Sequence, residues 1–82
     1  MQKIDCLSEL MPGQWATVHK ILLQGEMRRR LQDLGFTKGC DIKCVFFASS
    51  KDPVAYRVRG TLLALRVKDA QGILVKKRRE FQ

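Results

Sequence analysis

The apolar segments of this sequence are short, and nearly every one ends at a glycine or a proline. Pro12-Gly13 closes the first segment, Gly35 follows a helical one, and Asp52-Pro53 and Gly60 divide the second half of the chain. These residues favour tight turns, because glycine accepts positive φ and proline fixes its own φ. Many short strands joined by tight turns are typical of a small antiparallel barrel, so a mainly β fold is predicted.

Residue patterning predicts about five short strands in this barrel. β-branched and aromatic residues are frequent in the first strand, and the others show alternation or short apolar runs bounded by turns. A charged, basic tail follows the last strand. The predicted strands span residues 14–23, 41–48, 54–59, 61–66 and 73–75, and the tail spans residues 76–82.

Two of these strands allow individual side chains to be assigned to a face. Apolar and polar residues alternate in residues 54–59, which is the pattern of a strand with one buried side. Gly60 and Thr61 then fit a two-residue hairpin turn. The pattern predicts that Val54, Tyr56 and Val58 face inward and that Arg57 and Arg59 face outward.

The strand predicted at residues 41–48 contains two adjacent phenylalanines. Ile42, Cys44 and Phe46 share one face because side chains alternate along a strand. Phe46 and Phe47 therefore point to opposite faces, and one of them is expected in the core. An exposed Phe47 would help to form a docking surface.

One longer helix is predicted at residues 26–34, between the first two strands. Met27, Leu31 and Leu34 lie at positions i, i+4 and i+7 and form a single apolar stripe. Gly35 stands where a glycine commonly ends a helix in the left-handed conformation. Shorter helical turns are predicted at residues 5–10 and 68–72.

The 82 residues suit one small domain, and their charge is unevenly distributed. A chain of this size buries only about 60% of its unfolded surface, which leaves little room for a deep, dry reaction chamber. No apolar stretch reaches the roughly 18 residues that span a bilayer, and no apolar signal segment begins the chain.

Residues 1–27 carry two basic and three acidic side chains, whereas residues 28–82 carry fourteen and five, which gives +8 overall. Such a surface favours an acidic partner, whether nucleic acid, an anionic membrane face or an acidic protein patch.

The cysteines predict no disulfide framework and no metal site. Cys6, Cys40 and Cys44 are an odd number without a signal segment, which is typical of reduced thiols in a cytosol. Cys40 and Cys44 could not share a zinc ion along a strand, because four residues cover about 13 Å. Cys44 is predicted to be a small core residue. His19 is predicted to be a half-buried strand residue, and a metal shared between chains through a surface Cys or His stays open.

Catalytic residues and cofactors are not predicted either. The sequence contains one histidine, no Cys–His motif and no Gly-rich loop that would hold a phosphate. Asp41 and Asp52 are expected to be turn residues.

Four segments, taken in order, carry a pattern of family-level motifs. Residues 30–39 are similar to the signature RLxxLGxxPG, with Lys38 where proline is usual. The other segments are residues 7–13 (LSxLxPG), Asp52-Pro53 with residues 59–66 (DP…RGxxLALR), and Asp69-Ala70 with Ile73 and Val75 (xxAxxIxV). Together they resemble the FeoA family over residues 7–75. The basic tail at residues 76–82 lies outside the pattern.

The resemblance implies an SH3-like barrel and a role in ferrous iron uptake without chemistry of its own. The implied partner is a FeoB-like membrane transporter with a cytosolic GTPase domain. The protein would bind and modulate this transporter from the cytoplasm, at the inner membrane through its partner, and would take no small-molecule substrate. Neither the resemblance nor the composition indicates an oligomeric state.

Four residues are the candidate contacts to this partner. Arg28, Arg29 and Lys38 lie on or near the helix, and Phe47 is the fourth. Cationic side chains around an apolar patch suit docking to an acidic protein surface. The alternative is a solvated helix face, with Arg30 paired to Asp33 or Glu26.

Two further hypotheses follow from the residues. The +8 charge and the basic run at residues 76–79 favour a small barrel that binds nucleic acid. An SH3-type groove for Pro-rich peptides would need aromatic walls, for which Trp15 and Tyr56 are the candidates. SH3-like domains also occur as regulatory modules of metal-dependent repressors, but this sequence has no helix-turn-helix to which such a module would be attached.

Overall fold

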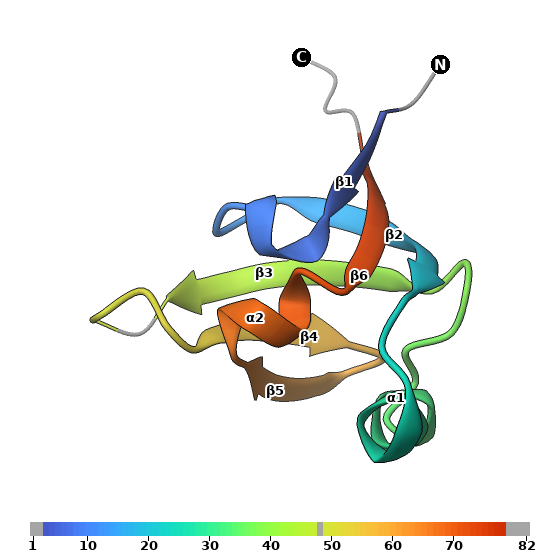
Figure 1. Ribbon diagram of the computed structural model, residues 1–82. Coiled ribbons are helices and arrows are strands. Elements are labelled where there is room, and N and C mark those ends of the chain that lie inside the picture. The colour runs from blue at the N-terminus through green and yellow to red at the C-terminus, as the bar shows by residue number, and fades with distance from the viewer. Residues whose placement is uncertain (1–2, 48, 79–82) are drawn as a thin grey trace.

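The computed structural model describes residues 3–47 and 49–78, with the side chains of all of these except Phe47. Six antiparallel strands form one sheet in the order β1-β6-β2-β3-β4-β5, so the predicted mainly β fold is confirmed. Strand β3 crosses the middle of Figure 1, with β4 and β5 below it and β2 above it. The elements are β1 (Ile4–Cys6), η1 (Leu7–Glu9), β2 (Trp15–Ile21), α1 (Gly25–Asp33), β3 (Asp41–Phe47), β4 (Val54–Val58), β5 (Thr61–Leu65), α2 (Val67–Ala70) and β6 (Ile73–Lys77).

Strand β1 and the end of β6 were not predicted from the sequence. Strand β6 lies between β1 and β2, and Lys76 is paired with Ile4 on one side and with Thr17 on the other. Lys76 and Lys77 therefore belong to a strand, and their assignment to a tail was wrong. The reason is that neighbouring strands supply backbone partners to residues without a strand-like side-chain pattern. Residues 79–82 of the predicted tail lie outside the described residues.

A β-bulge in β3 changes which side chains face the core. The pairing of β3 with β4 shifts between Cys44 and Phe46. Ile42 and Cys44 are fully buried as predicted, but Phe46 is 52% exposed. The prediction that Phe46 shares their face was wrong, because one extra residue in a bulged strand breaks the alternation. The side chain of Phe47 is not among those that the structure describes, so its predicted orientation stays a prediction.

The hairpin between β4 and β5 turns one residue earlier than predicted. Val58 is paired with Thr61, so Arg59 and Gly60 are the two turn residues. Their φ angles of 50° and 80° are those of a type I′ turn, whose twist matches that of the flanking strands. Arg59 therefore leaves the strand, and the predicted Gly60-Thr61 turn was wrong.

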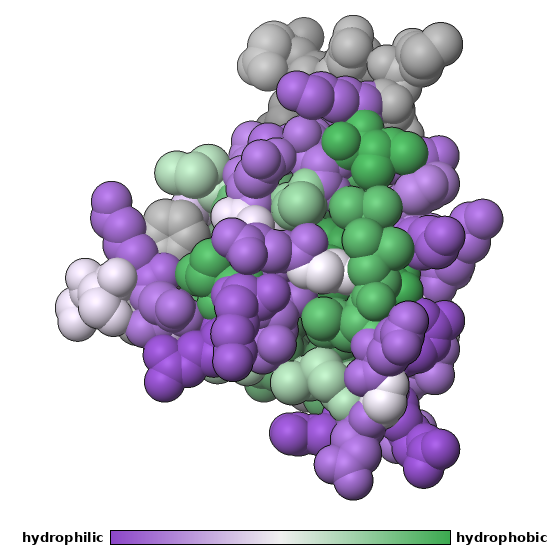
Figure 2. Space-filling view, viewed as in Figure 1, coloured by the Kyte–Doolittle hydropathy of each residue, from purple (hydrophilic) through white to green (hydrophobic). Residues whose placement is uncertain are grey.

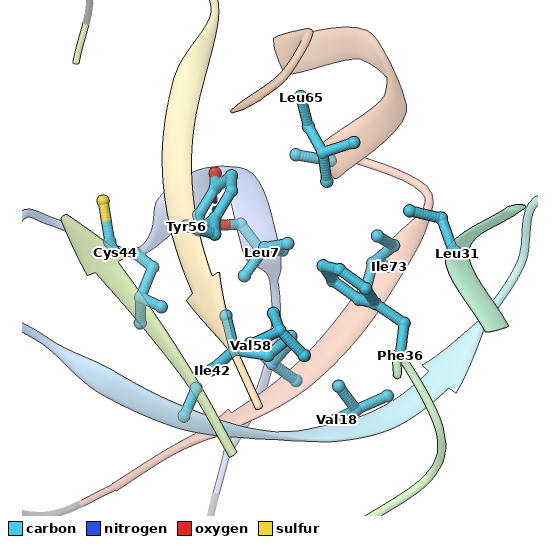
Figure 3. Packing of buried hydrophobic residues seen from close by; sticks show 14 of the residues in the cluster. Leu7, Val18, Leu31, Phe36, Ile42, Cys44, Tyr56, Val58, Leu65 and Ile73 are labelled. Atoms are coloured by element: carbon cyan, nitrogen blue, oxygen red, sulfur yellow. Dashed lines mark hydrogen bonds between the residues drawn. The ribbon is translucent and has the colours of Figure 1, made fainter. Parts of the chain in front are cut away.

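The hydrophobic core lies inside the curved sheet, and Leu7 of η1, Leu31 of α1 and Ala70 of α2 complete it. Tyr56, Val58 and Val54 face inward as the alternation predicts, with exposed fractions of 0%, 0% and 2%. Figure 3 shows the Tyr56 ring beside Leu7, and its hydroxyl donates to the Leu7 carbonyl oxygen at 3.4 Å. Phe36 reaches in from the segment after α1 and lies near Val18, Leu31 and Ile73.

The end of α1 places Phe36 in this core. The Gly35 N–H donates to the Gln32 carbonyl at 3.1 Å, and the Phe36 N–H donates to the Leu31 carbonyl at 2.8 Å. This pair of bonds is the Schellman motif, in which a residue of positive φ reverses the chain. Gly35 has φ of +105°, so the predicted glycine end of the helix is confirmed. The reversal brings Phe36 back against Leu31, and both are buried.

Asp52 joins the loop after β3 to the helix α2. Its Oδ1 accepts a hydrogen bond from the Val67 N–H at 3.1 Å, at the first residue of α2. The same oxygen lies 3.8 Å from Nη1 of Arg66. Asp52 therefore satisfies a free amide at the helix start, a contact that the assignment as a turn residue missed.

Replacing Asp52 with alanine is expected to lower the free energy of unfolding by about 1 kcal/mol, the usual effect of removing a helix-capping oxygen. Urea denaturation followed by circular dichroism measures this change. Asp33→Ala is the matched control, because Asp33 is exposed at the end of α1 and its loss should cost close to nothing. Equal losses in the two variants would contradict the capping role of Asp52.

Candidate functional site

Two of the residues predicted to bind a partner line the same groove. Strand β2 forms one wall, helix α1 forms the other, and the segment after α1 closes one end. The hollow measures about 250 Å³, and we call it the β2–α1 groove. It is lined by Val18, His19, Lys20, Ile21, Arg28, Gln32, Phe36, Thr37 and Lys38.

The β2–α1 groove is cationic. Lys20, Arg28 and Lys38 line it and are exposed, and His19 is half-buried beside them, as predicted for that histidine. Its lining contains no aspartate or glutamate. The buried Phe36 is also among the lining residues, so the cationic side chains stand around an apolar part of the groove. This arrangement suits a carboxylate-bearing or otherwise acidic protein segment.

Arg28 also stabilises the groove. Its Nη1 donates to the Ile21 carbonyl oxygen at 2.7 Å and so ties α1 to the end of β2. The guanidinium group has five N–H donors, and the others stay available for a partner. Arg28 is therefore a structural residue as well as a candidate contact, which the sequence did not indicate.

The other two arginines of α1 lie outside the β2–α1 groove. Arg29 lies with Arg28 and Glu26 in a second, open hollow of about 410 Å³. Arg30 lines a third hollow, between α1 and β5. Within the described residues, no ion pair joins Arg30 to Asp33 or Glu26, the pairing considered for a solvated helix face. The structure thus brings Arg28 and Lys38 together and leaves Arg29 beside them.

The hollow between α1 and β5 is mainly apolar. It measures about 260 Å³, with Met27, Leu34 and Leu63 among its lining residues and Arg30 and Arg66 also present. Leu34 is 39% exposed, which departs from the buried stripe expected for it. The reason is that α1 ends at Asp33, so Leu34 is the cap residue at the point where the chain turns away.

Cys40, Cys44 and Tyr56 are parts of the core, whereas Cys6 is half-buried. Cys44 is fully buried as predicted, and Cys40 is 8% exposed. Burial raises the pKa of the Cys44 thiol, which disfavours the thiolate that a metal ligand or nucleophile requires. Burial, and secondarily the nearby Cys44, also raise the pKa of Tyr56. Among residues 3–47 and 49–78, no group of three or more His, Cys, Asp or Glu is placed to hold a metal ion.

The aromatic groove considered for Pro-rich peptides is not formed by its two candidates. Tyr56 is fully buried and donates to Leu7, so it cannot line a surface groove with Trp15. The alternating pattern predicted that Tyr56 faces inward. The structure shows that its place in the core excludes a role in the wall of a peptide groove.

A family model described as the FeoA domain matches residues 6–77 of this chain. The chain belongs to the FeoA family. This confirms the resemblance carried by the four motifs, and it links the protein to ferrous iron transport. Within the described part of the chain, no helix is both long and apolar enough to cross a membrane.

Relatives of known sequence and structure agree with the family. An Fe(2+) transport protein A/Fe(2+) transporter FeoB fusion protein of Porphyromonas gingivalis is 38% identical over 69 residues. The match spans 84% of this chain but only 8% of the fusion protein. The FeoA protein of Chlorobium tepidum has a TM-score of 0.87 and 36% identity, over 94% of this chain and 73% of that one. FeoA of Stenotrophomonas maltophilia, described as an SH3 domain protein and complexed with zinc, has a TM-score of 0.75 and 32% identity, over 85% and 87% of the two chains.

Proposed function

We propose that this protein is a non-enzymatic cytoplasmic accessory of ferrous iron uptake that docks on a FeoB-type membrane transporter and modulates it. The observation that supports this most is the Porphyromonas gingivalis relative, in which a similar domain and the transporter form one polypeptide. A covalent link keeps two modules at a high effective concentration. The same two modules on separate chains need a docking surface of their own.

The β2–α1 groove is the proposed docking surface. Lys20, Arg28 and Lys38 would pair with acidic side chains of the transporter's cytosolic part, with Arg29 beside them. Leu22 directly follows the groove residue Ile21 and is 49% exposed. A cationic groove next to an exposed leucine provides both electrostatic steering and apolar burial.

A second apolar feature of the surface lies over β1 and β6. Figure 2 shows hydrophobic residues gathered in a stripe that runs over β1 and β6 toward α1, flanked by hydrophilic residues. Ile4 is 42% exposed, and Leu74 is half-buried. An exposed apolar stripe rimmed by charge is typical of a protein interaction surface. Modulation would follow if the protein binds one conformation of the transporter or its GTPase domain more tightly than another.

The proposal predicts a specific loss of transporter binding. Lys20→Gln/Lys38→Gln should weaken binding to a purified FeoB-type transporter in detergent by on the order of tenfold or more at low salt. Affinity is measured by biolayer interferometry with nucleotide present. Lys51→Gln/Lys68→Gln is the matched control, since both lysines are exposed and lie outside the β2–α1 groove. An equal loss in the control would show non-specific charge attraction, and no binding by the unsubstituted protein would refute the proposal.

A further inference from the structure

A row of long side chains crosses the outer face of the sheet at the start of β2. Strand register places Trp15 opposite Lys43, Lys43 opposite Arg57, and Arg57 opposite Leu62. Arg78 continues the row beyond Trp15, because its N–H donates to the Trp15 carbonyl oxygen at 2.9 Å. Neighbouring strands are about 4.8 Å apart, so the row extends for roughly 20 Å. We call these five residues the basic row.

Trp15 is held within the basic row by its cationic neighbours. The Lys43 Nζ lies 5.6 Å from the centre of the Trp15 ring, and the Arg78 Cζ lies 5.4 Å from it. Both distances are within the range of cation–π interactions. Arg78 also forms an ion pair with Asp41, at 2.7 Å between Nη2 and Oδ1. Among the described residues, no carboxylate lies within ion-pair distance of Lys43 or Arg57.

A shallow hollow of about 410 Å³ opens beside the basic row. It is lined by Arg57, Arg59, Trp15, Gly39, Gly60, Cys40 and Asp41. The Asp41 carboxylate is already paired with Arg78, and the two arginines have no such partner among the described residues. Arg59 uses its Nε to donate to the Gly35 carbonyl at 3.3 Å, which leaves its terminal nitrogens free of that bond. Two guanidinium groups at one hollow suit a phosphodiester, because arginine can donate two parallel bonds to phosphate oxygens.

We propose that the basic row, together with Arg59 at the hollow beside it, binds the surface of an anionic phospholipid bilayer. Lys43, Arg57 and Arg59 would contact the phosphates of the headgroups. Trp15 and the 49% exposed Leu62 would enter the apolar edge of the interface between them. Tryptophan favours this depth because its ring is apolar and its N–H is polar, and long basic side chains reach back to the headgroups.

The basic row and the β2–α1 groove share no residue, although Gly39 at the hollow directly follows Lys38 in the groove. Trp15 begins β2 and Lys20 lies five residues further along it, which is about 16 Å on an extended strand. One molecule can therefore bind a bilayer through the basic row while the β2–α1 groove stays open to a protein. The lipid proposal does not depend on the docking proposal, because vesicles contain no transporter.

A nucleic acid is the alternative ligand for a basic face, and the side chains favour lipid. Binding to single strands relies on aromatic rings on which bases stack. Trp15 is a single ring in the basic row, Phe36 and Tyr56 are fully buried, and the exposed Phe46 lies three residues along β3 from Lys43. The row therefore offers no pair of neighbouring rings for stacking. Headgroup phosphates need only the cations and the interfacial side chains.

Vesicle binding by the whole protein tests the lipid proposal. The protein should sediment with vesicles of phosphatidylglycerol and phosphatidylcholine at 0.1 M salt, and it should not sediment with vesicles of pure phosphatidylcholine. Each basic residue at the anionic surface is expected to contribute about 1 kcal/mol to the binding free energy. Trp15 is the single tryptophan of the chain, so its emission should shift to shorter wavelength on the anionic vesicles. Lys43→Gln/Arg57→Gln should weaken binding about thirtyfold, since it removes two such contributions.

The variants of the docking experiment provide the controls. Lys20→Gln/Lys38→Gln carries the same charge change and should bind anionic vesicles like the unsubstituted protein. Lys43→Arg/Arg57→Lys keeps both charges and should recover most of the binding, the remaining loss being the paired bonds of the Arg57 guanidinium. This variant separates lost charge from lost folding. Equal weakening in the two glutamine variants, or binding without a change in Trp15 emission, would overturn the proposal. Tighter binding to single-stranded RNA than to vesicles at the same salt would assign the basic row to nucleic acid instead.

Discussion

Phe36→Ala is expected to lower the free energy of unfolding by about 3–5 kcal/mol, because it empties a fully buried aromatic site. Figure 3 shows the ring among Val18, Leu31 and Ile73, so its removal leaves a cavity between α1 and the sheet. A small domain has roughly 5–15 kcal/mol of stability in total, and this loss is a large part of it. Urea denaturation monitored by circular dichroism measures the change. The β2–α1 groove should also lose its shape, since Phe36 forms part of its wall.

Phe46→Ala is the matched control for this prediction. The same side chain is removed from a site that is 52% exposed, beside the β3 bulge. The expected loss is within about 0.5 kcal/mol, as for most surface substitutions. Equal stability of the two alanine variants would show that Phe36 does not fill the core.

Gly35→Ala is expected to destabilise the protein by about 2–3 kcal/mol. Its φ of +105° is unfavourable for any residue with a side chain, which costs about 1–2 kcal/mol. A Cβ at this position would lie 2.6 Å from the Cδ of Arg59 and would displace that side chain. The bond from the Arg59 Nε to the Gly35 carbonyl would be lost with it. Thermal and urea denaturation both report the effect.

Gly13→Ala separates the backbone cost from the steric one. Gly13 has φ of +91°, but no atom lies within 4 Å of a Cβ built there. Its replacement should therefore cost only the backbone contribution of about 1–2 kcal/mol. The double variant Gly35→Ala/Arg59→Ala should lack the steric contribution to the destabilisation, because alanine at position 59 removes the atoms that a Cβ at position 35 would meet. If Gly35→Ala were no worse than Gly13→Ala, the contact with Arg59 would have no energetic role.

Features that depend on neighbours in sequence were predicted well. The alternation in β4 identified three inward side chains, and the apolar spacing with Gly35 identified α1 and its end. These patterns are readable because the repeat of a strand or helix fixes which side chains share a face. Family membership was readable in the same way, since its motifs are turns, caps and short apolar runs within continuous segments.

The candidate surfaces depended on contacts between distant segments. Arg28 and Lys38 are ten positions apart, and Lys20 comes from a different element, yet all three line the β2–α1 groove. The basic row draws single residues from several strands, and no spacing along the chain relates Trp15 to Arg57 or Arg78. Strand register alone sets these neighbours.

The sequence by itself determined the kind of fold, the main helix with its glycine end, the inward face of β4 and the family. Tertiary structure decided that β1 exists, that Lys76 and Lys77 are in a strand, that β3 bulges after Cys44, and that Arg59 turns the hairpin. The physical reason is the range of the interactions. Side-chain periodicity and glycine conformation act within a few residues, whereas strand pairing, bulges and grooves arise only when separate segments exchange hydrogen bonds and pack together.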